Sequence, residues 1–415
     1  MKMTKRGKDI LGLIVVSLVL IAMLASTSCA PAAPEVKILK WGALEPLSGA
    51  AAPWGINMNR GAILAAEEFN AKGGLNVGGT IYKIEILEED DKYTGTEGVA
   101  AVTRLIHEEG VRFITGTLAS TVILAIQPIT EPAKCVITTN AFADVLSADK
   151  PYTFRIGVSV LQGTAGVFKA IHDLYPGPKR VVDIFPNDAS GWGNADTVKI
   201  ASDALGWDVV ATEFFERGTT DFHPVLTKML AKNPDIIETG CCPSSVQALI
   251  AAQAYEMGYR GLQSGMLIMP KLQAEKGGPG NVGMIGFFAT EYTAPWITPE
   301  QKELYDRHQA NWPGEEMFYQ VEIAYIGTTG MFLAIEKAGT LEQPAMIDTW
   351  QDLKWDTPVG EASWVDFDHY GYKGIKRQIS LPHPITRLNA DGSLDLVTFS
   401  DLGPTLKEMG ITITK

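Results

Sequence analysis

The feature that most constrains the fold is an alternation of short apolar strands with helical stretches of ten to fifteen residues, which occurs twice along the chain. The first set predicts strands at 38–44, 81–88, 111–115 and 135–139, and helices at 57–71, 95–109 and 121–131. The second set predicts strands at 181–185, 209–215 and 236–239, and helices at 193–205, 222–231 and 244–257. Strands joined through helices pair in parallel, so the predicted fold is α/β with two doubly wound parallel-sheet lobes. Because such sheets bind ligands at the carboxyl ends of their strands, two facing lobes would enclose a cleft.

The chain changes character after Trp355. Residues 377–388 and 394–399 have the composition of strands, and Asn389-Ala390-Asp391-Gly392 between them is a turn sequence. This arrangement is typical of an antiparallel hairpin and predicts one near the end of the chain.

The start of the chain has the features of an export signal. Four basic residues among the first eight precede residues 10–24, a run of fifteen residues that is apolar except for Gly12 and Ser17. Spanning a bilayer takes about 20 apolar residues, so the run suits a signal peptide, expected at 1–28 and followed by a tether at 29–37. Cys29 ends a segment that resembles a bacterial lipobox, which predicts a lipid anchor there; cleavage after Ala30 is the alternative. We therefore expect an exported protein, in the periplasm or on the outer face of the cell membrane.

The charge balance argues against a nucleic-acid partner. Lys and Arg number 35 against 48 Asp and Glu, which gives a net charge of −13. Phosphate binding needs clustered basic residues, and this chain has no basic tract beyond its leader.

Motifs for catalysis are missing or lie in the wrong context. Residues 278–283 match G-x-G-x-x-G, but an apparent strand follows the motif instead of preceding it, so a surface loop is expected. The six histidines show no metal-ligand spacing. For Asp90-Asp91 we expect a solvated or hinge role in preference to acid–base work. The sequence therefore predicts no enzyme activity, no catalytic residues, no metal and no cofactor, with an enzyme on a two-lobed scaffold as a minor alternative.

Several short motifs occur in an order and spacing that resemble a known family. They are Pro46-Leu47-Ser48-Gly49, Trp54-Gly55, Gly61-Ala62, residues 67–74, Asp90-Asp91, residues 116–120, Asn187-Asp188, residues 220–222, Pro234-Asp235 and Phe367-Asp368 with Gly371. Together they resemble the leucine/isoleucine/valine-binding family of ABC-transporter solute-binding proteins. The resemblance implies two lobes joined by three crossovers, with lobe 1 at 38–156 plus 289–356 and lobe 2 at 157–288 plus 357–415. It implies a monomer that closes on a small ligand by a hinge motion and delivers it to an ABC permease. A ligand-sensing receptor subunit of the same fold is the alternative.

The resemblance also implies ligand-binding positions. Trp54 matches a tryptophan that covers the ligand, although it could instead pack on its own loop. Ser120 matches a serine that holds the ligand carboxylate, and a helix N-cap is the alternative role. The remaining positions implied by the family are Asn140, Ala141, Phe142, Trp192, Cys242 and Met266.

At some of these positions the chain departs from the family pattern. Phe142 replaces a hydroxyl, Cys241-Cys242 replaces an aromatic contact, and the stretch around Met266 has no acid where the family binds the ligand ammonium with a Glu. A desolvated ammonium without an acceptor costs several kcal/mol. The hypothesis is therefore a small carboxylate, aromatic or aliphatic, with a branched-chain amino acid as the alternative. Cys241 and Cys242 are expected to be two buried residues that end a strand, and a vicinal disulfide is the alternative.

Overall fold

A computed structural model of the protein describes residues 36–266, 268–287, 291–365 and 375–411. The predicted signal peptide, the proposed anchor Cys29 and the Phe367-Asp368 motif lie outside these residues. Within them, no helix is both long enough and apolar enough to cross a membrane.

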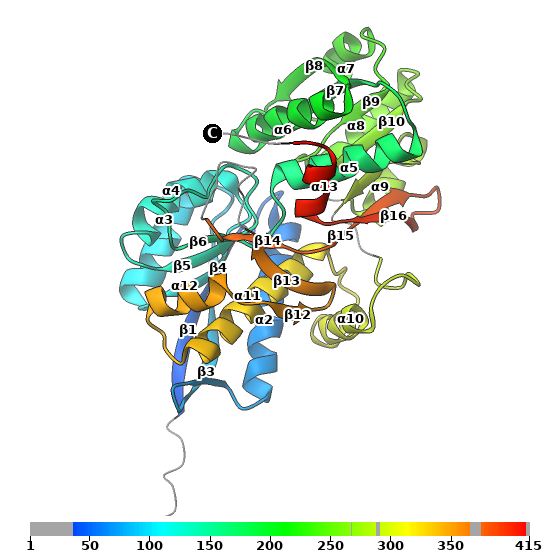
Figure 1. The fold of residues 1–415 in the computed structure, drawn as a ribbon. Coiled ribbons are helices and arrows are strands. Elements are labelled where there is room, and N and C mark those ends of the chain that lie inside the picture. Colours follow the sequence, from blue (N-terminus) through cyan, green and yellow to red (C-terminus); the bar gives the residue numbers. More distant parts are fainter. Residues whose placement is uncertain (1–35, 267, 288–290, 366–374, 412–415) are drawn as a thin grey trace, which may run out of the picture.

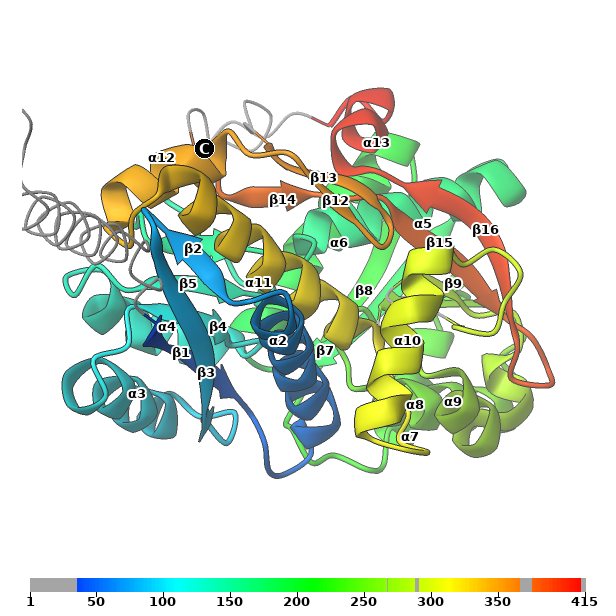
Figure 2. The same ribbon diagram turned by 90° about the horizontal axis from the view of Figure 1, so that it is seen from below.

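The first lobe is built on a nine-stranded sheet, with the order β12-β13-β14-β6-β5-β4-β1-β3-β2. Its strands are β1 (Val36–Glu45), β2 (Leu75–Val77), β3 (Thr80–Asp90), β4 (Phe113–Gly116), β5 (Val136–Thr139), β6 (Thr153–Arg155), β12 (Trp355–Thr357), β13 (Gly360–Val365) and β14 (Gln378–Ser380). Its helices are α2 (Ala52–Ala71), α3 (Gly95–Thr103), η1 (Arg104–Glu108), α4 (Ser120–Thr130), α10 (Pro299–Asn311), α11 (Tyr319–Ala338) and α12 (Gln343–Gln351). Helices α2 and α11 cover one face of the sheet, and α3 and α4 cover the other (Figure 2).

The second lobe is built on a seven-stranded sheet, with the order β16-β15-β11-β10-β9-β7-β8. Its strands are β7 (Arg180–Pro186), β8 (Asp208–Phe215), β9 (Ile236–Glu238), β10 (Leu262–Met266), β11 (Ile285–Phe287), β15 (His383–Leu388) and β16 (Leu394–Ser400). Its helices are α5 (Val160–Leu174), α6 (Ala189–Leu205), α7 (His223–Leu230), α8 (Ser244–Glu256), α9 (Pro270–Gly277), η2 (Gly278–Asn281) and α13 (Leu402–Glu408). Figure 1 shows the two lobes as separate bodies that meet along one edge.

The pairing confirms the predicted α/β fold with two mostly parallel sheets. β1 pairs in parallel with β3 and β4, and β7 pairs in parallel with β8 and β9. The predicted hairpin is confirmed by the antiparallel pair β15 and β16. The G-x-G-x-x-G match falls in η2 and the turn before β11, which confirms a connecting loop and not a phosphate turn.

The predicted boundary at residue 356 is wrong. β13 pairs with β14, and β14 pairs in parallel with β6, so both of these strands belong to the first sheet and not to the second. The apolar stretch 377–388 reads as one strand but is two, because β14 ends at Ser380 and β15 begins at His383 in the other sheet. Pro382 between them has no N–H to offer to either ladder, which suits a crossing point.

Close packing of α2 on α11 ties the two ends of the first lobe together. A Cβ on Gly61 would lie 2.2 Å from the carbonyl oxygen of Val321, so only glycine allows the two helix backbones this close. The same helices bury an aromatic cluster, in which Trp41 stacks on Phe113 and meets the edge of Phe332 with ring centroids 5.3 and 4.7 Å away.

Two acids are buried side by side in the second sheet. Asp183 on β7 is paired in register with Glu238 on β9, and their exposed fractions are 0% and 3%. Burial raises the pKa of each carboxyl to about 7. Because the folded state then holds protons that the unfolded state has released, these acids stabilise the fold at low pH, and that contribution is lost as the pH rises through about 7.

We therefore expect Asp183→Asn to flatten the dependence of stability on pH. We compare the free energy of unfolding of the variant with that of the unmodified protein at each pH. From pH 4 to pH 8 this difference should shift in favour of the variant by about 2 to 4 kcal/mol, since each pKa unit is worth about 1.4 kcal/mol. Chemical denaturation across this pH range measures the effect, and the exposed Asp196→Asn on α6 is the control. Curves that stay parallel for Asp183→Asn and the unmodified protein would contradict the assignment.

Candidate ligand-binding site

A small cavity lies between the two lobes, where strands of both sheets end. Its water-accessible volume is about 20 Å³, which is room for about one water molecule. The first lobe contributes Trp54, Tyr93, Leu118, Asn140, Phe142 and Gln320, and the second contributes Ser190 and Cys241. Because both lobes line the cavity, entry of a larger ligand requires the lobes or these side chains to move apart.

Apart from the aliphatic Leu118 and the Cys241 thiol, the described residues that line this cavity are aromatic or polar, and none is a carboxylate, Lys, Arg or His. Trp54, Tyr93 and Phe142 supply three rings. Asn140 and Gln320 supply amides that can both donate and accept hydrogen bonds. Such a lining can stack on a flat ligand and exchange hydrogen bonds with a polar group on it.

Trp54 is held by the first turn of α2. Its backbone N–H donates to the carbonyl of Ala51 at 3.0 Å, and the side chain is 7% exposed. The next residue must be glycine, because a Cβ on Gly55 would lie 2.1 Å from the carbonyl oxygen of Pro46. The loop before α2 therefore packs tightly on the start of the helix, and this contact fixes the position of the Trp54 indole ring.

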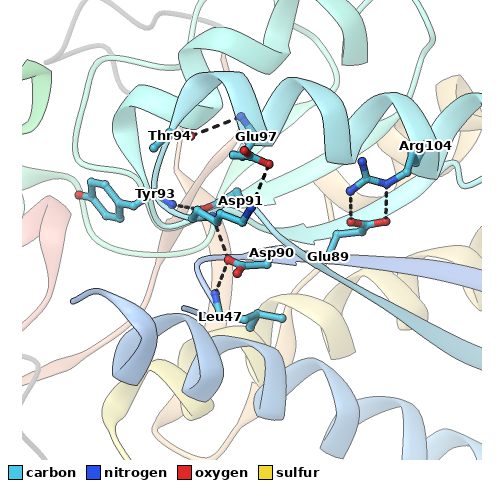
Figure 3. A network of polar contacts seen from close by, with 9 residues as sticks. Leu47, Glu89, Asp90, Asp91, Tyr93, Thr94, Glu97 and Arg104 are labelled. Carbon is cyan, nitrogen blue, oxygen red and sulfur yellow. Dashed lines mark hydrogen bonds and ion pairs between the residues drawn. The ribbon is translucent and has the colours of Figure 1, made fainter. Parts of the chain in front are cut away.

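Two acids position Tyr93: Asp90, the last residue of β3, and Asp91, which follows it (Figure 3). Asp90 Oδ1 accepts the N–H groups of Leu47 and Lys92 at 2.8 and 2.9 Å. Asp91 Oδ1 accepts the N–H of Tyr93 at 2.7 Å, which stabilises the left-handed φ of +49° at Lys92 and +60° at Tyr93. The side chain of Asp91 is fully buried, so the expected solvated role is wrong for this residue. Its chemistry is structural: it holds the turn that presents Tyr93 to the cleft.

Ser120 lies behind the cavity wall and joins two loops. It is the first residue of α4, and the N-cap is Ala119, so the alternative role as an N-cap is wrong. Its Oγ accepts the backbone N–H groups of Phe142 at 3.2 Å and Ala143 at 3.0 Å. The hydroxyl proton remains available as a donor. Among the described residues nothing accepts a hydrogen bond from the backbone N–H of Ser120 or Thr121 at this helix start.

Asn140 and Ala141 follow β5 and differ in their contact with the cavity. Asn140 lines it, and its Oδ1 is buried without a hydrogen-bond partner among the described residues. Ala141 is fully buried behind the wall, and its N–H donates to Thr139 Oγ1 at 3.1 Å. A Cβ on Gly157, where the chain leaves the first lobe, would lie 1.4 Å from Asn140 Oδ1. This glycine therefore leaves space for the Asn140 amide at the edge of the cleft.

The residues predicted in the second lobe do not line the cavity. Trp192 is 54% exposed, and its Nε1 donates to Asn187 Oδ1 at 3.1 Å. Cys242 is fully buried, with its Sγ 3.2 Å from the carbonyl oxygen of Ile184. Met266 is 1% exposed at the end of β10. Cys241 and Cys242 are both buried, as expected, but they lie in the turn that follows β9 and do not end the strand itself.

Five lining residues were not found by sequence reasoning. They are Tyr93, Leu118, Ser190, Cys241 and Gln320. Four of them follow the carboxyl end of a strand in parallel pairing, where such sheets bind ligands, so a strand-end rule could have found these residues. Gln320 comes from the first turn of α11, and no strand-end rule points to it.

A contact between Tyr93 and Arg217 links the lobes across the cavity. The Arg217 guanidinium lies 4.8 Å from the centre of the Tyr93 ring, and its Nη2 is 3.3 Å from the Tyr93 hydroxyl. Arg217 Nε donates to Asp188 Oδ2 at 2.7 Å. Burial raises the pKa of Tyr93 to about 12, which keeps the phenol neutral at ordinary pH. In the described part of the chain, no group of three His, Cys, Asp or Glu residues is arranged to hold a metal.

The family and its relatives agree with this architecture. The sequence pattern of the periplasmic binding protein family matches residues 38–374. An amino acid binding protein from Pseudomonas aeruginosa is 25% identical over 78% of this chain and 85% of its own length. The leucine-, isoleucine-, valine-, threonine- and alanine-binding protein of the same organism is 26% identical over 84% of this chain and 90% of its own length.

Solved structures show the same fold with two kinds of ligand. A leucine binding protein from Thermotoga maritima superposes with a TM-score of 0.74 at 21% identity, covering 87% of this chain and 98% of that one. An ABC-transporter solute-binding protein from R. palustris in complex with 4-hydroxybenzoate superposes with a TM-score of 0.74 at 22% identity, covering 88% and 98%. The chain therefore belongs to the periplasmic binding protein family, as a solute-binding protein of the kind that serves ABC transporters.

Proposed function

We propose that the protein captures a small aromatic carboxylate, such as a benzoate, for its ABC permease. The observation that carries the proposal is the lining of the cavity, which combines three aromatic rings with uncharged polar groups. Each ring stacked on an aromatic ligand contributes about 0.5–1.5 kcal/mol beyond the burial of apolar area. Trp54, Tyr93 and Phe142 would hold the ligand body in this arrangement.

The carboxylate would be bound at the start of α4. The backbone N–H groups of Ser120 and Thr121 have no acceptor among the described residues, and the Ser120 hydroxyl still has its proton to donate. The positive end of the helix dipole favours an anion at this position. Leu118, which precedes the helix, lines the cavity and places this helix start beside it.

An α-amino acid would lack a counter-charge for its ammonium. Two acids behind the wall already make hydrogen bonds within the protein. Glu45 Oε2 accepts the N–H of Leu118 at 3.0 Å, although its Oε1 has no partner among the described residues, and Asp91 accepts the N–H of Tyr93. Burial raises the pKa of Glu45 well above its usual value, so this side chain tends to be neutral. An ammonium left unpaired in the cleft would cost several kcal/mol.

The solved neighbours leave the ligand class open, and the aromatic, uncharged lining supports the aromatic carboxylates. One neighbour binds benzoate, another 4-hydroxybenzoate and a third isoleucine. A thermal-shift screen with benzoate, 4-hydroxybenzoate, leucine and isoleucine tests the proposal. A ligand at 100 times its Kd adds about 2.7 kcal/mol to the free energy of unfolding. We expect a shift with the benzoates only, and a shift with the two amino acids only would contradict the proposal.

We further propose that Cys29 is acylated after removal of residues 1–28, which anchors the protein at the membrane surface. The lipobox-like Ser26-Thr27-Ser28-Cys29 supports this assignment, and several acyl chains suffice for stable anchoring. Cys29→Ala should move the exported protein from the membrane pellet to the soluble fraction, as measured by immunoblot. An equal distribution of Cys29→Ala and the unmodified protein in the soluble fraction would show that no anchor forms.

A further inference from the structure

The contact between Tyr93 and Arg217 joins two loops that belong to different lobes. Tyr93 follows β3 in the first lobe, and Arg217 follows β8 in the second. The Arg217 guanidinium lies 4.8 Å from the centre of the Tyr93 ring, which is within cation–π distance, and its Nη2 is 3.3 Å from the Tyr93 hydroxyl. We call this contact the Tyr93–Arg217 latch.

Each partner of the latch is held in place by its own lobe. The Asp91 carboxylate accepts the N–H of Tyr93, and the tyrosine ring projects from that turn (Figure 3). Arg217 Nε donates to Asp188 Oδ2 at 2.7 Å, while Asp188 Oδ1 accepts the N–H of Ser190 at 3.0 Å and so caps α6. Because both side chains are positioned before they meet, the latch forms at a low cost in side-chain entropy.

The latch lies far from the segments that connect the lobes. The chain crosses between lobes from β6 to α5, from β11 to α10 and from β14 to β15. In the first sheet β3 is four strands away from β6, and in the second sheet β8 is four strands away from β11. Neighbouring strands are about 4.8 Å apart, so the latch lies about 19 Å from the crossovers, where a hinge rotation of about 10° separates the lobes by about 3 Å.

A small rotation therefore breaks the latch but leaves contacts at the crossovers nearly unchanged. One such contact is the hydrogen bond from Ser380 Oγ to Asp401 Oδ1 at 3.0 Å, which lies where β14 passes into β15. Among the contacts described between the lobes, the latch is thus placed where it resists opening with the longest lever arm.

We propose that the Tyr93–Arg217 latch holds the two lobes closed in the absence of ligand and opens when a ligand enters or leaves. The cavity of about 20 Å³ has room for about one water molecule, so the cleft must widen before a ligand can enter. Arg217 is not among the described residues that line the cavity, so it acts on closure and does not touch the ligand. Because the latch is a contact of the protein with itself, the inference does not rest on the proposed ligand of the cleft.

The fraction of closed molecules in the ligand-free protein tests the latch. Spin labels attached to Ala100→Cys on α3 and Thr227→Cys on α7, which are exposed positions on different lobes, report the separation of the lobes by pulsed electron paramagnetic resonance. The labelled protein also carries Cys29→Ala, and the other three cysteines are buried. The measured distance distribution gives the ratio of closed to open molecules.

Arg217→Ala should lower the ratio of closed to open molecules by about 2- to 30-fold, the effect of losing one cation–π contact. Arg260→Ala is the matched control, because the Arg260 guanidinium lies 3.6 Å from the centre of the Tyr255 ring within the second lobe. This control should leave the ratio unchanged. An equal ratio in Arg217→Ala and the unmodified protein, or an unmodified protein that is entirely open without ligand, would overturn the inference.

Variants of Tyr93 test whether its ring is the partner of Arg217. Tyr93→Phe keeps the ring and should keep most of the closed molecules, whereas Tyr93→Leu should open the protein as Arg217→Ala does. Combining Tyr93→Leu with Arg217→Ala should cause no further opening, because each substitution removes the same contact. Additive effects of the two substitutions, or a Tyr93→Leu protein as closed as the unmodified one, would contradict the latch.

Discussion

Replacing Ser120 by alanine is expected to weaken benzoate binding by about 10- to 150-fold, the range for losing a hydrogen bond to a charged group worth about 1.5–3 kcal/mol. The variant removes the hydroxyl donor beside the start of α4. It also leaves the N–H groups of Phe142 and Ala143 without the Oγ acceptor that they share, at 3.2 and 3.0 Å. Because Phe142 lines the cavity, its ring loses its fixed position at the same time. Calorimetric titration of the variant with benzoate measures the change in Kd.

The matched control for Ser120→Ala is Thr298→Ala. Thr298 is the N-cap of α10, where its hydroxyl accepts the N–H of Gln301 at 3.0 Å, so its loss removes a helix-start hydroxyl outside the cleft. Thr298→Ala should lower stability by about 1 kcal/mol and leave the Kd for benzoate unchanged. Equal affinity of Ser120→Ala and the unmodified protein for benzoate would show that the carboxylate does not bind at the start of α4.

Trp54→Ala is expected to weaken benzoate binding by about 30- to 150-fold, as for a buried aromatic side chain that contributes 2–3 kcal/mol to an interface. The indole is 7% exposed at the cavity wall, so truncation removes a stacking surface that water would then occupy. Trp54→Phe keeps a ring in the same place and should recover most of the affinity. Competition with a fluorescent benzoate analogue measures the Kd for benzoate of the unmodified protein, Trp54→Ala and Trp54→Phe in the same assay.

Trp192→Ala is the control for Trp54→Ala, and it tests whether Trp192 contacts the ligand. The Trp192 ring is 54% exposed and bonded to Asn187, outside the cavity lining. The structure therefore predicts an unchanged Kd for Trp192→Ala. A loss of affinity comparable to that of Trp54→Ala would restore the assignment that the sequence made for Trp192.

The alternation of strands and helices was enough to predict the two sheets, because each unit is a local pattern of apolar residues. Trp54, Asn140 and Phe142, the positions that the family resemblance implied, line one cavity. The end of the first lobe could not be predicted from such a pattern. β14 and β15 are separated by Leu381 and Pro382 alone, and only long-range pairing with β6 shows that the chain changes sheets there.

The expected site residues of the second lobe differ from the cavity lining for another reason. Neighbouring residues at a strand end point in different directions, so a one-residue uncertainty exchanges Cys242, which is buried, for Cys241, which lines the cavity. Tyr93 depends on a turn with two left-handed residues, held by the carboxylate of Asp91. Neither residue at these positions is glycine, so the sequence carries no local signal for that turn.

The central claim is that the cleft accepts a carboxylate without an α-ammonium, and matched pairs of ligands test it most directly. 3-Phenylpropanoate differs from phenylalanine, and 4-methylpentanoate from leucine, only in lacking that group. Calorimetric titration should show the acid of each pair binding at least about 100-fold more tightly than its amino acid, since an unpaired buried ammonium costs about 3 kcal/mol or more. Tighter binding of phenylalanine or leucine than of the matching acid would contradict the account and would mean that an acid such as Glu45 reaches the ligand.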